Sequence, residues 1–180
     1  MKPVLLFRFC PRCGAPSETE PREDTNEFRC GRCALRYFFN PTVAVAVFVT
    51  RHDGRTLFIR RAREPAKGRL APPGGFIDIG ETAENAARRE LREEVGLDIR
   101  NVEFLCSHPN SYVFAEVTYP VVDLFFTAEA VDASATADAR EVSECLWLDP
   151  LEVAAGELAF PSMRHAMEIW QARLGARRDP

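Results

Sequence analysis

The chain lacks any apolar run that approaches the ~20 residues needed to cross a bilayer. Its first apolar run, residues 4–7, is too short for the hydrophobic core of a secretion signal and is followed at once by Arg8. Basic charge is not in excess, because 23 Lys and Arg face 27 Asp and Glu, giving a formal net charge of −4. These absences predict a cytoplasmic protein without a membrane segment or broad nucleic-acid binding.

Histidine is scarce as well, with three residues in a chain of 180. His52 falls in a predicted hairpin turn, His108 in the segment 107–114 and His165 in the last helix, and none has metal-ligand spacing. The sequence therefore predicts no histidine-based metal site. A chain that is 46% hydrophobic can bury one sizeable core and a small appendage.

The six cysteines are not expected to form disulfides in a reducing compartment. Four of them form two CxxC pairs separated by sixteen residues: Cys10, Cys13, Cys30 and Cys33. This spacing is typical of a structural zinc site with four thiolate ligands. The other two, Cys106 and Cys145, lie in apolar surroundings and are predicted to be small buried hydrophobes.

The cysteine pattern divides the chain. Residues 1–38 are predicted to form a zinc ribbon, which is too small to fold on hydrophobic burial alone and needs the metal. Its polar middle, residues 17–27, is predicted to be an exposed loop. Asn40-Pro41 marks the junction to a second domain, residues 39–180. Strands are expected at 43–50, 56–61, 101–106, 112–116, 121–130 and 145–148, and a final helix opens at Pro161.

A glycine-led loop followed by a short helix occupies residues 75–97. Thr82 is a suitable N-cap and Gly96 a suitable C′ residue. Between them an apolar stripe recurs every four residues, at Ala83, Ala87, Leu91 and Val95. Such a stripe predicts a helix that packs one face on a sheet.

Three carboxylates stand beside this stripe. Glu90, Glu93 and Glu94 occupy positions i, i+3 and i+4, so they project from adjacent turns on one side of the helix. Their mutual repulsion makes sense if a hard divalent cation neutralises them, and oxygen ligands suit Mg²⁺ or Mn²⁺. Arg89 is four residues before Glu93 and is expected to hold that glutamate in place.

These residues resemble the Nudix box, with its constrained positions filled by Gly75, Glu81, Arg89, Glu90, Leu91, Glu93, Glu94, Gly96 and Leu97. The resemblance implies an α+β fold of the α/β/α sandwich type, with a mixed β-sheet between helices. It also implies a hydrolase that cleaves a nucleoside diphosphate linked to some group X. A zinc ribbon directly before such a domain resembles the NADH pyrophosphatase branch of the family and its shorter relatives.

The resemblance also assigns roles. Glu90 and Glu94 would be the strongest ligands of Mg²⁺ or Mn²⁺, with help from the Gly74 carbonyl, while Glu81 would support them. The family uses a further acidic residue from a later loop, for which Glu141 is the first candidate and Glu144 the alternative.

The substrate is predicted more coarsely. NADH-specific relatives carry a Ser-Gln-Pro-Trp-Pro-Phe-Pro signature after the box, and residues 107–114 keep only part of it. The resemblance therefore favours an adenine dinucleotide or sugar such as ADP-ribose, FAD or NAD(H), with Tyr112 available to stack on a base. Arg60 and Arg61 end a strand whose faces alternate, so only one faces the site, and Arg60 is the candidate for binding phosphate.

Two alternative functions remain open from the residues. The first is a noncatalytic Nudix nucleotide sensor, although such a protein is expected to lose box carboxylates. The second is a Nudix protein that removes RNA caps and grips RNA with the ribbon. Residues 1–40 carry seven Lys and Arg against five Asp and Glu, which is a weak basic patch. The ribbon is therefore predicted to be structural and to contribute to a homodimer interface.

Overall fold

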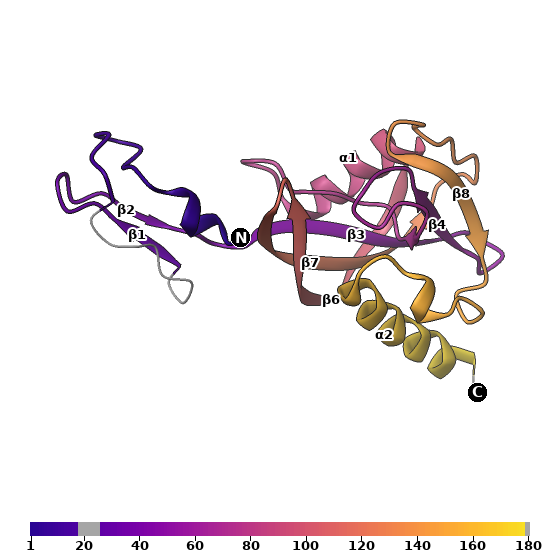
Figure 1. Ribbon diagram of the computed structural model, residues 1–180. Coiled ribbons are helices and arrows are strands. Elements are labelled where there is room, and N and C mark those ends of the chain that lie inside the picture. The colour runs from indigo at the N-terminus through magenta and orange to yellow at the C-terminus, as the bar shows by residue number, and fades with distance from the viewer. Residues whose placement is uncertain (18–25, 179–180) are drawn as a thin grey trace. The chain divides into compact units, whose positions relative to one another are not determined.

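The computed structural model describes residues 1–17 and 26–178 (Figure 1). The chain forms two compact units: unit 1 comprises Met1–Thr42 and Ser111–Val121, and unit 2 comprises Val43–Asn110 and Val122–Pro180. The loop predicted at 17–27 lies mostly outside the described residues. Within the described residues no helix has both the length and the apolar character needed to span a membrane.

Unit 1 is built around a short antiparallel pair of strands, β1 (Glu27–Arg29) and β2 (Arg36–Phe38), and a one-turn helix η1 (Pro3–Leu6). Its buried core is small and consists of Cys10, Ala15, Phe28 and Cys30. The aromatic rings of Phe7 and Phe39 extend this core, with centroids 4.8 Å apart. So little buried apolar surface gives limited stability by itself, which is consistent with the prediction that this unit needs a metal.

The sheet of unit 2 has the strand order β5-β4-β3-β7-β6, and β8 pairs with β4 off this path. The strands are β3 (Thr42–Thr50), β4 (Thr56–Arg61), β5 (Leu70–Ala71), β6 (Ile99–Phe114), β7 (Val117–Ala130) and β8 (Val142–Leu148). β4 runs antiparallel to β3, β5 and β8. The Thr42 and Thr50 hydroxyls donate to the carbonyls of Pro120 and Ala128, each 78 residues further on, so β3 and β7 run parallel. The sheet is therefore mixed.

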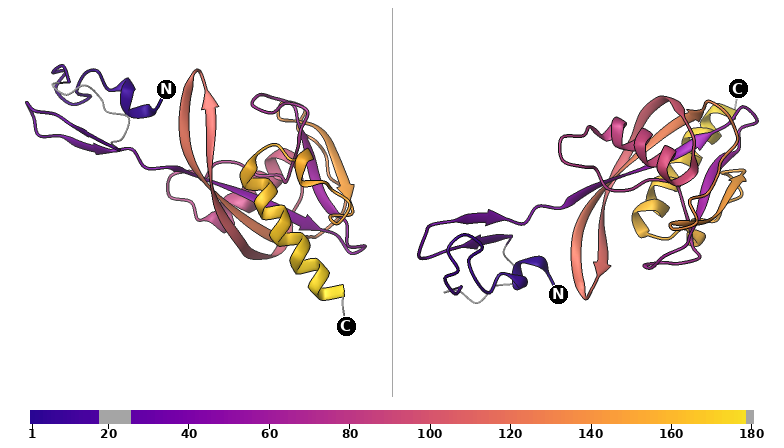
Figure 2. Two further views of the ribbon diagram at one scale, coloured as in Figure 1. Left: turned by 60° about the horizontal axis from the view of Figure 1, so that its bottom comes forward. Right: turned by 90° about the horizontal axis from the view of Figure 1, so that it is seen from above.

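A helix covers each face of this sheet. Alternate residues of β3 enter different cores: Val47 packs in the core that contains Leu91 of α1 (Ala83–Val95). Phe48 packs instead in the core that contains Trp170 of α2 (Pro161–Arg178). The short helix η2 (Ala155–Glu157) comes just before α2 in the chain. The views in Figure 2 place α1 and α2 on opposite sides of the sheet. The predicted α+β arrangement, a mixed sheet between helices, is confirmed.

One sequence-based expectation about the strands is wrong. Two separate strands were expected at 101–106 and 112–116, whereas β6 runs unbroken from Ile99 to Phe114. Pro109 lies within this strand, and β6 is the last strand of the sheet order, where a missing N–H is tolerated. β6 and β7 form one hairpin with positive φ at Ala115 and Glu116, a turn normally formed by Asn-Gly.

Candidate functional site

The helix that carries the carboxylates begins and ends where the sequence predicts. The Thr82 hydroxyl accepts a hydrogen bond from the Asn85 N–H at 3.3 Å, which caps the N-terminus of α1. Gly96 has φ of 67°, and the N–H groups of Gly96 and Leu97 return to the carbonyls of Arg92 and Leu91, each at 3.1 Å. The Gly96 bond and its positive φ are those of the αL C-cap motif, in which glycine is favoured.

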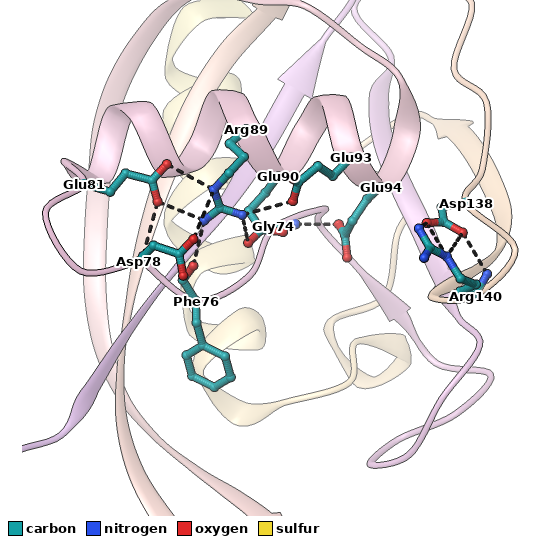
Figure 3. A network of polar contacts seen from close by, with 10 residues as sticks. All are labelled: Gly74, Phe76, Asp78, Glu81, Arg89, Glu90, Glu93, Glu94, Asp138 and Arg140. Atoms are coloured by element: carbon teal, nitrogen blue, oxygen red, sulfur yellow. Dashed lines mark hydrogen bonds and ion pairs between the residues drawn. The ribbon is translucent and has the colours of Figure 1, made fainter.

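Glu94 is the most enclosed carboxylate of α1, with 8% of its surface exposed. Its Oε2 accepts a hydrogen bond from the Gly74 N–H at 2.9 Å (Figure 3). Burial raises the pKa of its carboxyl to about 8, and the charges of Glu90 and Glu141 add to the rise. The site therefore holds a carboxylate that lacks enough positive charge around it.

Glu90 lies directly behind the glycine loop. Burial raises the pKa of its carboxyl, although the neighbouring Arg89 opposes this effect. A Cβ atom at Gly75 would lie 2.5 Å from Oε1 of Glu90, closer than any real contact. Gly75 thus leaves room for the Glu90 carboxylate, which a Cβ atom at this position would push aside.

Arg89 connects the carboxylates of the box. Its Nη1 donates to Glu90 at 2.7 Å and to Glu93 at 3.1 Å, while Nε and Nη2 donate to the two oxygens of Glu81 at 3.0 and 2.9 Å. Nη2 also donates to the Phe76 carbonyl at 3.0 Å, which ties the loop to the helix (Figure 3). These hydrogen bonds lower the pKa of Glu81. One cation thus serves three carboxylates, and negative charge remains in excess.

The side chains of Glu90, Glu93 and Glu94 offer carboxylate oxygens on one side of α1, and oxygen atoms are the ligands that a hard divalent ion such as Mg²⁺ prefers. The glutamate oxygens are spread more widely than the cysteine sulfurs. Within 1–17 and 26–178, only the four cysteines bring three or more such donor atoms all within 4.8 Å of one another. Between Glu90 and Glu93 lies the guanidinium of Arg89, and the Glu93 side chain is 61% exposed.

Of the two candidate loop carboxylates, Glu141 is the one that interacts electrostatically with the carboxylates of α1. Its charge contributes to the raised pKa of both Glu90 and Glu94. The Glu141 side chain accepts a hydrogen bond from Arg63 at 3.2 Å. Glu144 instead pairs with Arg60 across the β4–β8 ladder at 3.0 Å.

The two arginines at the end of β4 have different partners. Arg60 binds Glu144 and the Gly68 carbonyl. Arg61 donates to the Pro65 carbonyl at 2.9 Å and lies over the Phe160 ring at 5.2 Å, and its charge partly offsets the effect of burial on the pKa of Glu94. The pairing of β4 with β8 shifts register between Arg60 and Arg61, which no sequence pattern reveals.

Tyr112, the predicted stacking residue, lies on the part of β6 that belongs to unit 1, whereas the carboxylates belong to unit 2. It is half-buried and already has contacts of its own.

The four predicted zinc ligands lie together in unit 1. The Sγ atoms of Cys10 and Cys33 are 3.6 Å apart, and those of Cys13 and Cys30 are 3.7 Å apart. Tetrahedral zinc with Zn–S bonds of about 2.3 Å requires sulfurs roughly 3.8 Å apart, so the arrangement fits. Burial alone would raise the pKa of Cys10, but backbone N–H groups and the neighbouring thiols outweigh it and lower the pKa to about 6.

Comparisons with known proteins agree with this geometry. The model of the NUDIX domain family matches residues 40–168. A protein named NAD-capped RNA hydrolase NudC from Vibrio atlanticus is 28% identical over 145 residues, which are 79% of this chain and 49% of that protein. A protein of the same name from Stutzerimonas stutzeri is 28% identical over 180 residues, 98% of this chain and 60% of that protein. The chain thus spans about half to three-fifths of the curated relatives.

Solved structures show the same fold. A NUDIX hydrolase from Nitrosomonas europaea superposes with a TM-score of 0.69 at 22% identity, covering 94% of this chain and 93% of its own. The NUDIX domain of Shewanella oneidensis NrtR, crystallised with ADP ribose, superposes with a TM-score of 0.62 at 26% identity. That superposition covers 76% of this chain and 90% of the NrtR domain chain.

Proposed function

This chain belongs to the Nudix family, and from that premise we propose that it is a metal-dependent pyrophosphohydrolase. It would cleave the diphosphate linkage of a nucleoside diphosphate joined to a group X, releasing a nucleoside monophosphate and phosphorylated X. The observation that carries the proposal is the set of carboxylates on α1 behind the Gly74-Gly75 turn, one of them buried with too little positive charge nearby.

Mg²⁺ or Mn²⁺ would be held by Glu90, Glu93 and Glu94, with the Gly74 carbonyl as a further oxygen donor. When bound, such an ion offsets the charge of the diphosphate and makes an attacking water more acidic. Arg89 would keep Glu90 and Glu93 aligned through its bonds at 2.7 and 3.1 Å. Glu141 would supply the additional carboxylate, as base or ligand. Zn²⁺ in the four-cysteine site would hold the ribbon in its fold.

The proposed substrate is an adenine dinucleotide or sugar, such as ADP-ribose, FAD or NAD(H). Two findings favour this class: the curated relatives are named for NAD-capped RNA, and the NrtR domain was crystallised with ADP ribose. A diphosphate flanked by two ribosides also needs cations, and Arg61 is the arginine of β4 whose charge reaches Glu94. We therefore propose Arg61 as a phosphate contact in addition to Arg60, the candidate from sequence.

A product assay across a substrate panel tests the proposal. ADP-ribose, FAD, NAD⁺, NADH and a short RNA with a 5′ NAD cap would each be incubated with wild type and Glu94→Gln, with Mg²⁺ and with Mn²⁺. Metal-dependent release of a nucleoside monophosphate by wild type alone would agree with the proposal. Binding without cleavage would favour a nucleotide sensor, and cleavage of the RNA alone would favour the cap-removing alternative suggested by the relatives' name.

We also propose a homodimer and a cytoplasmic location. Unit 1 exposes several large apolar side chains, including Phe9 (63%), Phe38 (55%) and Phe114 (65%), which are costly to leave in water. None of the six cysteines, all of which the structure describes, forms a disulfide, which suits a reducing compartment. Light scattering would show a mass of about twice 20.2 kDa if the dimer forms.

A further inference from the structure

The loop that carries Glu141 is attached to the end of the helix that carries Glu94. The Thr136 N–H donates to the Val95 carbonyl and the Asp138 N–H donates to the Glu94 carbonyl, each at 2.8 Å. These are carbonyls of the last helical turn, which have no partner inside the helix. The loop is thus hydrogen-bonded to the backbone of a proposed metal ligand, although residues 133–138 have no regular secondary structure.

Asp138 also starts a tight turn, residues 138–142, that leads from this loop into β8. Its carbonyl accepts from the N–H groups of Glu141 at 2.9 Å and Val142 at 2.8 Å. Its Oδ1 accepts from the Arg140 N–H at 3.0 Å, and its Oδ2 binds the Arg140 guanidinium at 2.6 Å (Figure 3). The Asp138 side chain is 23% exposed whereas that of Arg140 is 80% exposed, so the ion pair closes the turn from the solvent side.

Glu141 is fixed at its other end by β4 and the loop that follows. The Ala62 N–H donates to the Glu141 carbonyl at 2.9 Å, and Arg63 binds the side chain at 3.2 Å. Three backbone attachments therefore set where Glu141 lies relative to Glu94: the α1 carbonyls, the Asp138 turn and the Ala62 N–H. Arg63 adds a fourth attachment, at the Glu141 carboxylate itself.

We propose that Asp138 is a positioning residue that sets the distance between Glu141 and the carboxylates of α1, and so the affinity of the site for divalent ions. The inference rests on the proposed function, because it gives Glu141 a role at the metal site. Asp138 need not touch substrate or ion, since its carboxylate is engaged with Arg140. Its effect would pass through Glu141.

The test is a double-mutant cycle between Asp138→Ala and Glu141→Gln, read out by Mn²⁺ affinity in the zinc-loaded protein and by kcat and KM. We expect each single change to weaken Mn²⁺ binding and lower kcat by roughly tenfold, as for residues that orient metal ligands, with little change in KM. Asp138→Ala should cause no further loss in the Glu141→Gln background. Independent losses that multiply would overturn the proposal, as would unchanged Mn²⁺ affinity in either single variant.

Two further variants separate geometry from charge. Asp138→Asn removes the same charge but can still accept the Arg140 N–H, so it should lie closer to wild type than Asp138→Ala. Equal losses in both would assign the effect to charge and overturn positioning. If Asp138→Ala fails to fold, the cycle is run with Asp138→Asn, for which a smaller loss of Mn²⁺ affinity is expected, again with no further loss in the Glu141→Gln background. The matched control is Asp132→Ala, which removes a similar turn made with Ser134 in the same loop and should leave Mn²⁺ affinity unchanged.

The Mn²⁺ measurement does not depend on turnover. If wild type cleaves no compound of the panel, the proposed function fails while the cycle still decides the role of Asp138. If wild type is active and the cycle is additive, the proposed function stands and the positioning role is rejected.

Discussion

Glu94→Gln should stabilise the metal-free protein at alkaline pH while it removes a proposed metal ligand. Glu94 is 8% exposed, and burial raises the pKa of its carboxyl to about 8, so the fold disfavours the charged form. Glutamine has nearly the same shape, stays neutral, and can accept the Gly74 hydrogen bond through its amide oxygen.

The pH dependence follows from the two states of this carboxyl. In the unfolded chain it ionises near its ordinary pKa of 4.5, whereas in the fold it ionises near 8. The buried charge therefore does not lower the free energy of unfolding below pH 4.5. Its destabilising effect grows as pH rises and is complete above about pH 8. At about 1.36 kcal/mol per pKa unit the full shift corresponds to roughly 5 kcal/mol. Relaxation of the surroundings reduces this upper bound, so we expect a gain of about 1–3 kcal/mol.

Urea unfolding followed by tryptophan fluorescence measures the effect, because Trp147 and Trp170 both lie in unit 2. The buffers would contain no Mg²⁺ or Mn²⁺ but would avoid strong chelators, which would strip zinc from the ribbon. Unfolding free energies would be compared across the pH range for wild type, Glu94→Gln and Glu93→Gln. Glu93 is the matched control because its side chain is 61% exposed.

We expect the advantage of Glu94→Gln over wild type to grow with pH, and Glu93→Gln to show no such trend. A difference that is independent of pH, or an equal gain in the control, would refute the burial argument. Added Mg²⁺ should narrow the difference, since a bound ion stabilises only the protein that keeps its ligand.

Three other predictions concern the loop, the arginine and the zinc site. Gly75→Ala should lower Mg²⁺-dependent turnover by on the order of 10²-fold, because its Cβ would displace the Glu90 carboxylate. The control is Gly156→Ala, whose Cβ meets no atom within 4 Å and which should leave turnover unchanged in the same assay. Arg89→Lys should lower kcat by roughly tenfold or more, because one ammonium cannot replace the forked contacts to three carboxylates and a carbonyl; kcat equal to wild type would contradict this. Cys13→Ser should reduce bound zinc and expose unit 1 to proteolysis, which metal analysis and limited digestion would detect.

The local structure of the box could be predicted from sequence because its determinants are local. Thr82 and Gly96 bound the helix through capping and positive φ, which depend on a few neighbouring residues. The apolar stripe likewise determines which face packs on the sheet. The pairing of Arg89 with Glu93 follows from helical spacing alone.

The remaining features depend on contacts between distant segments. Helical spacing cannot show that Arg89 also binds Glu81, which comes from the loop before the helix. Alternation along β4 could not decide between Arg60 and Arg61, because the register shift beside β8 arises only in the assembled sheet. The unbroken β6 contains Pro109, which is tolerated at a sheet edge, and sequence alone does not reveal which strand is the edge.

The most direct test of the central claim is product formation from the preferred nucleoside diphosphate compound, measured against Mg²⁺ concentration for wild type and Glu94→Gln. Wild type should show saturable, Mg²⁺-dependent release of a nucleoside monophosphate, and the folded variant should lose at least about 10³-fold in turnover. Equal turnover in the two proteins, or cleavage by wild type without any divalent ion, would contradict the claim that these glutamates gather the metal.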